Sequence, residues 1–219
     1  MNQIVPPSLL FDCQLSIPRC DMPSTRRTGR LLKLPDEATL FVPSAMDGTP
    51  QFAHLKAGWN ENGIGLHVSV AGRKQPLSGD AGDLKNSDSI LIWLDTRHAG
   101  NVHRATEYCH HFACLPVDEN ADGSATVTVQ PIAQQRAQKL ESDPRKMLCR
   151  THLTKVGYDF EIWIPGTQLY GFREIAEIGR IGFFCVVHDT ELGSQFLSLD
   201  DDFPYAYDPS VWPQLELLS

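Results

Sequence analysis

The stretch Ser87-Asp88-Ser89-Ile90-Leu91-Ile92-Trp93-Leu94-Asp95-Thr96-Arg97 has the pattern of a β-strand with a tryptophan in its middle and a carboxylate near each end. A second stretch, Gly157-Tyr158-Asp159-Phe160-Glu161-Ile162-Trp163-Ile164-Pro165, repeats that pattern. In both stretches one set of aliphatic side chains recurs at every second position, which is the period of a strand with one face in a core. The two stretches therefore predict a single antiparallel β-sandwich in an all-β protein.

The alternation also assigns the two faces of these strands. We expect an inner set that faces the core, namely Ile90, Ile92, Leu94, Phe160, Ile162 and Ile164. Trp93, Trp163 and Glu161 then lie on the outer face. His67 has the same parity in the alternating strand from Leu66 to Val70.

The rest of the chain divides into an extension and a domain. Residues 1–50 are rich in proline, which interrupts strands and helices, so we expect an irregular N-terminal extension packed on the domain. Residues 51–219 contain short strands separated by turns and predict the β-sandwich domain. One of these turns is Asn60-Glu61-Asn62-Gly63, where Asn-Gly is expected to supply a positive φ. A short helix is expected over residues 132–140.

Composition limits the partners and the compartment. The chain has 219 residues and a net charge of −8, without a basic stripe, which disfavours nucleic acid and anionic membrane surfaces as partners. We find no apolar run long enough for a transmembrane helix and no signal for export, so we expect a cytoplasmic protein. The six cysteines of such a chain are expected to be reduced thiols.

Five short motifs follow one another in a distinctive order. They are Trp59-Asn60-Glu61-Asn62-Gly63 before an alternating strand, Asp88 to Thr96, Tyr158-x-x-Glu161 with Ile164-Pro165, Gly179 to Phe183 with Asp189, and Pro209-x-x-Trp212. In this order they resemble the fold shared by family 9 carbohydrate-binding modules and DOMON domains, over residues 50–217. The stretch from Thr96 to Pro116 also resembles bacterial proteins of this type. The resemblance implies a β-sandwich, and it leaves the ligand open because the fold has sugar-binding and haem-binding members.

The resemblance and the outer-face residues together suggest a non-catalytic binding module. Trp93 and Trp163 would form an exposed platform that stacks a saccharide, and His67 or Glu161 would supply a polar contact. The alternative is that the N-terminal segment, or the helix near residue 136, covers this face. Both tryptophans would then be structural, in a sandwich that serves as a structural or protein-interaction domain.

The loop Asp118-Glu119-Asn120-Ala121-Asp122-Gly123 matches the opening of a calcium-binding loop. Asp118, Asn120 and Asp122 would be the metal ligands, although Val129 stands where such a loop has its glutamate. The alternative is a polar hairpin turn with Gly123 at a positive φ. No other cofactor is indicated.

The sequence offers little for catalysis. The group Cys109, His110, His111 and Cys114 suggests zinc or an enzyme site, but its spacing is not that of a zinc ribbon and an ordinary strand is the favoured interpretation. No nucleophile elbow, P-loop or dinucleotide-binding fingerprint occurs. Asp and Glu at strand ends, such as Asp88 and Asp189, are expected to accept hydrogen bonds from turns. We therefore expect no catalytic residues.

Overall fold

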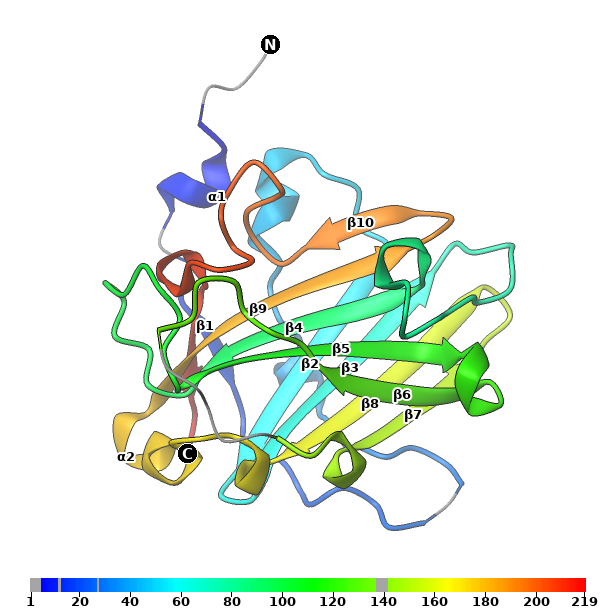
Figure 1. Ribbon diagram of the computed structural model, residues 1–219, viewed down its shortest axis with the longest axis horizontal. Coiled ribbons are helices and arrows are strands. Elements are labelled where there is room, and N and C mark those ends of the chain that lie inside the picture. The colour runs from blue at the N-terminus through cyan, green and yellow to red at the C-terminus, as the bar shows by residue number, and fades with distance from the viewer. Residues whose placement is uncertain (1–4, 12, 27, 137–141) are drawn as a thin grey trace.

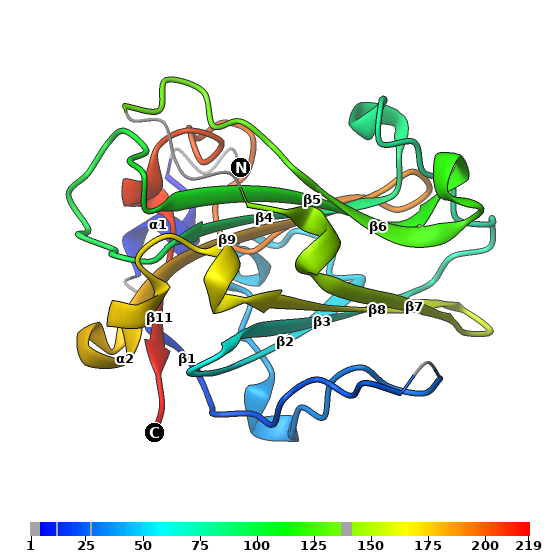
Figure 2. The same cartoon turned by 60° about the horizontal axis from the view of Figure 1, so that its bottom comes forward.

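The computed structural model describes residues 5–11, 13–26, 28–136 and 142–219, which form two facing β-sheets (Figures 1 and 2). The larger sheet runs in the order β1 (Leu15–Ile17), β11 (Gln214–Leu217), β9 (Arg180–Asp189), β4 (Ser89–Asp95), β5 (Cys109–Asp118) and β6 (Ser124–Val129), and β10 (Gly193–Phe196) also pairs with β9. The smaller sheet runs β2 (Ala53–Asn60), β3 (Gly63–Ala71), β8 (Gly157–Pro165) and β7 (Leu148–Leu153). This arrangement confirms the all-β sandwich.

The described helices are short. The α-helices are α1 (Pro7–Leu10) and α2 (Ile175–Ile178), and the 3-10 turns are η1 (Asp36–Ala38), η2 (Pro43–Asp47), η3 (Leu84–Asn86), η4 (Glu119–Ala121), η5 (Pro144–Lys146), η6 (Gly166–Gln168), η7 (Phe172–Glu174) and η8 (Pro209–Val211). None of the described helices has the length and apolar character needed to cross a membrane. The helix expected over 132–140 is wrong for residues 132–136, where Gln134 at φ 60° makes a turn. The remainder, 137–140, lies outside the described residues.

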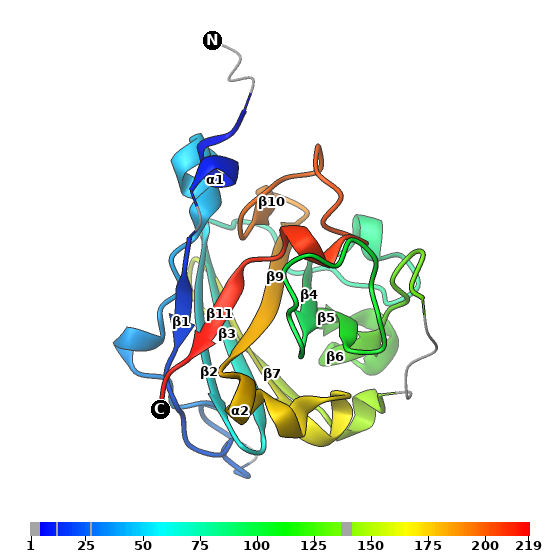
Figure 3. The same ribbon diagram turned by 90° about the vertical axis from the view of Figure 1, so that its left-hand side faces the viewer.

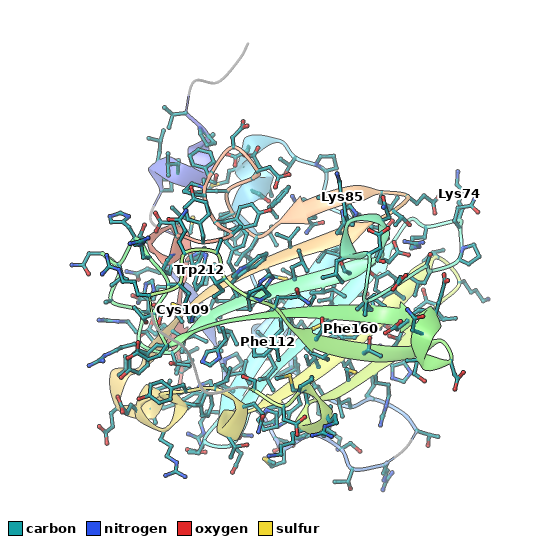
Figure 4. All side chains as sticks on the ribbon, viewed as in Figure 1. Lys74, Lys85, Cys109, Phe112, Phe160 and Trp212 are labelled. Atoms are coloured by element: carbon teal, nitrogen blue, oxygen red, sulfur yellow. The ribbon has the colours of Figure 1, made fainter. Side chains whose placement is uncertain are left out.

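The core between the sheets follows the alternation of the strands. All six residues of the expected inner set are at most 2% exposed, which confirms the assignment of that face. Phe112 of β5 and Phe160 of β8 lie near the centre of the sandwich and are fully buried (Figure 4). Close packing of this kind makes each inner side chain expensive to truncate.

The β2–β3 hairpin closes without the positive φ that was expected at its Asn-Gly pair. Asn60 pairs with Gly63, and the Asn60 side chain accepts a hydrogen bond from the backbone N–H of Asn62 at 2.8 Å. Gly63 is needed for another reason, since a Cβ added to it would lie 2.8 Å from the ring of Trp163. The glycine therefore makes room for a tryptophan on the neighbouring strand.

The described part of residues 1–50 adds a strand to the larger sheet and covers part of the smaller sheet. Strand β1 pairs with β11 in parallel, with Leu15 opposite Leu215 (Figure 3). Residues 18–26 and 28–34, which we call the N-terminal cover, then run across the outer face of the smaller sheet (Figure 2). The cover begins with a hydrogen bond from Cys20 N–H to the carbonyl oxygen of Trp59 at 2.9 Å.

A buried arginine joins the ends of strands from the two sheets. Arg73 follows β3, and its guanidinium donates hydrogen bonds to Asp88, which precedes β4, and to Asp189, which ends β9. All three side chains are at most 3% exposed. The Asp88 carboxylate also accepts hydrogen bonds from the backbone N–H groups of Ser78 and Thr190, at 2.8 and 2.7 Å. These contacts confirm that the strand-end carboxylates serve the turns.

The same contacts set the charge of Asp88. Burial alone would raise the pKa of this carboxyl, but the hydrogen bonds from Arg73, Thr190 and Ser78 outweigh burial and hold the pKa below its ordinary value of 3.8. Asp88 is therefore ionised in the folded protein throughout the neutral range.

Replacing Ile92 by alanine should lower the free energy of unfolding by about 2–5 kcal/mol, because Ile92 is 1% exposed between the sheets and its truncation leaves a cavity. Urea unfolding followed by tryptophan fluorescence measures the change. Leu153→Ala is the matched control, since Leu153 is 73% exposed and should lose less than about 0.5 kcal/mol. Equal losses in the two variants would contradict the assignment of the inner face.

The network around Arg73 predicts a loss of stability in acid. Because the folded pKa of Asp88 is lowered, its contribution is present above the unfolded pKa and is lost as the pH falls below about 4 through the folded value. In Asp88→Asn this part of the pH dependence should disappear, in addition to a constant loss of stability. Unfolding free energies measured across the acidic range test this, and an unchanged acid slope in Asp88→Asn would refute it.

Candidate functional site

Trp163 is buried on the outer face of the smaller sheet. Its side chain lies against Gly63 and Gly65 of β3, and the N-terminal cover places Leu31 and Leu32 over it. Only 2% of Trp163 is exposed. The expectation of an exposed platform is therefore wrong for Trp163, because a distant apolar segment already occupies its free face.

Trp93 is equally buried, on the outer face of the larger sheet. Its ring stacks on the imidazole of His111 with centroids 4.1 Å apart and packs edge-on against Tyr205 at 5.4 Å. Trp212 and Ile132 belong to the same buried cluster, and 2% of Trp93 is exposed. The platform expectation is wrong here too, and the two tryptophans lie on different sheets. The alternative is confirmed for Trp163, which the N-terminal segment covers, whereas Trp93 packs against Ile132, Tyr205 and Trp212.

Glu161 and His67 hold the N-terminal cover in place. The Glu161 carboxylate, 1% exposed, accepts hydrogen bonds from the backbone N–H groups of Leu31 at 2.8 Å and Leu32 at 3.2 Å. The Nε2 atom of His67 lies 3.0 Å from the guanidinium of Arg30 in the cover and 3.2 Å from the carboxylate of Asp159. Burial lowers the pKa of His67, and the opposing Asp159 carboxylate does not restore it. The structure thus brings Trp163, Glu161 and His67 together, beneath a segment of the same chain.

Replacing Glu161 by alanine should loosen the N-terminal cover, because two backbone N–H groups lose their common acceptor. We expect amide hydrogen exchange at Leu31 and Leu32 to accelerate at least about tenfold, which corresponds to about 1.4 kcal/mol of lost protection. Exchange at Ala38, whose N–H donates to the Pro35 carbonyl, is the internal control and should not change. Unchanged exchange at both leucines would contradict the anchoring role.

The Asp118 loop is a hydrogen-bonded hairpin turn. The Asp118 carboxylate accepts from the backbone N–H of Asn120 at 3.0 Å and from the Thr126 hydroxyl at 2.9 Å. Asp122 has φ 52°, and Gly123 has the expected positive φ of 72°. Within the described residues no group of three His, Cys, Asp or Glu side chains could hold a metal ion. A calcium site at Asp118, Asn120 and Asp122 stays a prediction.

The Cys109 to Cys114 region belongs to strand β5 and its packing. Cys109 lies beside Trp212 in the cluster around Trp93 (Figure 4). The Nε2 atom of His110 accepts a hydrogen bond from the backbone N–H of Tyr170 at 3.1 Å. Burial raises the pKa of the Cys114 thiol well above its ordinary value, which keeps it protonated and unreactive.

An open groove that the sequence did not predict lies at one end of the sandwich. It has a volume of about 560 Å³ and lies between the β2–β3 turn, the start of β5 and the segment after β8. We call it the tyrosine groove, after Tyr108 and Tyr170 in its wall. Its polar lining residues are Glu61, Asn62, Thr167, Gln168, Arg173 and Glu174.

Hydrogen bonds fix the backbone on both sides of Tyr170. The Thr96 hydroxyl donates to the Tyr170 carbonyl oxygen at 2.6 Å, and the Tyr170 N–H donates to His110. Gly171 follows with φ 78°, and a Cβ at this position would lie 2.6 Å from the ring of Tyr108. The glycine therefore lets the two tyrosine segments approach one another.

The two tyrosines form a tilted pair at the edge of the groove. Their ring centroids are 5.1 Å apart with an interplanar angle of 49°. Tyr170 is 39% exposed, and Tyr108 is half-buried. The Arg97 guanidinium lies over Tyr108, 4.8 Å from the ring centroid. An aromatic surface edged by amide, carboxylate and guanidinium groups suits a ligand with both apolar faces and polar substituents.

No protein-family model matches the chain, and no curated protein matches it. Its structure is similar to a family 9 carbohydrate-binding module from Caldicellulosiruptor kristjanssonii in complex with cellotriose, with a TM-score of 0.57 and 17% identity over 94% of each chain. A family 9 module from the same organism in complex with glucose matches at a TM-score of 0.51 and 19% identity over 75% of each chain. The chain has the fold of these modules, as its motifs indicated. The resemblance to DOMON domains stays a prediction.

Proposed function

We propose that the protein is a non-catalytic module that binds a saccharide in the tyrosine groove. The observation that carries this proposal is the pair Tyr108 and Tyr170, whose rings meet at the wall of an open groove. Sugar rings present C–H groups on their faces, and these pack against aromatic planes. The fold shared with modules crystallised with cellotriose and glucose supports the same class of ligand.

The polar lining would supply the contacts that orient a sugar. Asn62 is exposed on the β2–β3 turn, and Thr167 is exposed on η6, so both present hydrogen-bonding groups to solvent. Gln168 is less available, because its side-chain oxygen accepts from the Asp143 N–H at 2.7 Å. The backbone of Tyr170 is held by Thr96 and His110, so its ring is positioned before a ligand arrives.

Burial of Trp93 and Trp163 favours a second candidate, a structural or protein-interaction sandwich with no small ligand. In that case the tyrosine pair would have only a structural role, at the end of the core between the two sheets. The two candidates differ in one measurable property, which is whether any soluble saccharide binds to the groove.

Tyr170→Ala should weaken the binding of a soluble oligosaccharide by about 1 kcal/mol or more, roughly fivefold in Kd, because it removes one stacking surface. Isothermal titration against a panel of neutral and charged oligosaccharides measures this, with the strongest binder used for the variants. Tyr207→Ala is the matched control, since Tyr207 is also 39% exposed but does not line the groove.

Two results would overturn the proposal. One is a panel in which no saccharide binds, which would leave the second candidate standing. The other is a loss of affinity in Tyr207→Ala that equals the loss in Tyr170→Ala. Thermal melts of each variant confirm that the fold is intact.

A further inference from the structure

Two exposed arginines lie at the tyrosine groove, Arg173 in its lining and Arg97 over the ring of Tyr108. Four arginine side chains form ion pairs with carboxylates, namely Arg19, Arg30, Arg73 and Arg145. Arg97 and Arg173 form no ion pair with any described carboxylate, although the chain has 27 acidic residues and 19 lysines and arginines. Both are exposed. Two guanidinium groups thus remain available beside the aromatic pair of the tyrosine groove.

We infer that the ligand of the tyrosine groove is an anionic saccharide, and that Arg97 and Arg173 bind its carboxylate or sulfate group. This inference rests on the proposed function and specifies its substrate class. A uronic acid and a sulfate ester share the relevant chemistry, since each presents two or more oxygens to the planar donors of a guanidinium.

The position of Arg97 suits this role. Its guanidinium lies over the ring of Tyr108, 4.8 Å from the centroid, so a cation–π contact holds the group beside the stacking surface. That contact uses the face of the guanidinium and leaves its N–H groups, which point outward in the plane, for an acceptor. A sugar ring placed on the tyrosines would therefore bring a substituent within reach of Arg97.

The two acidic residues in the groove lining, Glu61 and Glu174, differ in how a neighbouring arginine balances their charge. Glu61 is paired with Arg19, and the hydrogen bond from Arg19 lowers the pKa of Glu61, so its charge is balanced by a neighbour. Glu174 is exposed and follows Arg173 directly on η7. The lining therefore has Arg173 and Glu174 as its remaining charges, with Arg97 added from above Tyr108. Two guanidinium groups, those of Arg97 and Arg173, therefore lie at the aromatic surface in a protein of net charge −8.

The test compares three oligosaccharides of equal length by isothermal titration: a neutral glucan, an oligogalacturonate and a sulfated glucan. We expect the wild-type protein to bind at least one anionic oligosaccharide about tenfold or more tightly than the neutral one, and added salt to reduce that preference. Arg97→Gln and Arg173→Gln should each reduce the preference for the anionic over the neutral oligosaccharide at least about fivefold. The anionic oligosaccharide that binds more tightly shows whether the groove prefers a carboxylate or a sulfate group.

Arg26→Gln is the matched control, because it removes the same charge from an exposed arginine that does not line the groove. Its preference should equal that of the wild type. Equal binding of the neutral and anionic ligands would overturn the inference and leave the proposed function standing. Anionic binding that survives Tyr170→Ala unchanged, or that falls equally in Arg26→Gln, would overturn it as non-specific attraction. Absence of binding by all three ligands would overturn the proposed function together with the inference.

Discussion

The buried guanidinium of Arg73 is the contact on which the alignment of the two sheets depends. A charge in the interior is tolerated only when it is paired and hydrogen-bonded, and here the partners come from the start of β4 and the end of β9. Arg73 itself follows β3 of the other sheet. Because the pairing needs all three chain segments in one place, it fixes how the sheets meet at that end. The opposite end, where the tyrosine groove lies, is left to turns and short helices.

The two ends of the sandwich therefore have different roles, because Arg73 aligns the sheets at one end and loops form the groove at the other. Loops at the edge of a rigid sandwich can carry aromatic and charged side chains without disturbing the core. Tyr108 and Tyr170 are in such segments, one entering β5 and one between η6 and η7. On the outer face of the smaller sheet, the N-terminal cover already contacts Glu161, His67 and the ring of Trp163.

The alternation of residues along each strand was sufficient to predict the inner faces of the sheets. It was not sufficient to predict which segments cover the outer faces. Ile92 and Phe160 could be assigned to the core because alternation along a strand is set by neighbouring residues. The burial of Trp163 depends on Leu31 and Leu32, more than a hundred positions away, and no periodicity reports such a contact. The tyrosine groove was missed for the same reason. Its signal was a Tyr-Gly pair after a strand and a tyrosine before another, which has no meaning until the chain is folded.

The parallel pairing of β1 with β11 has a consequence for synthesis of the chain. Strand β11 lies between β1 and β9 in the larger sheet, so β1 has no strand partner until Gln214–Leu217 are made. On the ribosome, Leu15 and Ile17 emerge 200 positions before Leu215 and Leu217, the residues they pair with in the sheet. The sandwich can therefore complete this edge only after Gln214–Leu217 have been made, and until then the early segment is a ready target for chaperones.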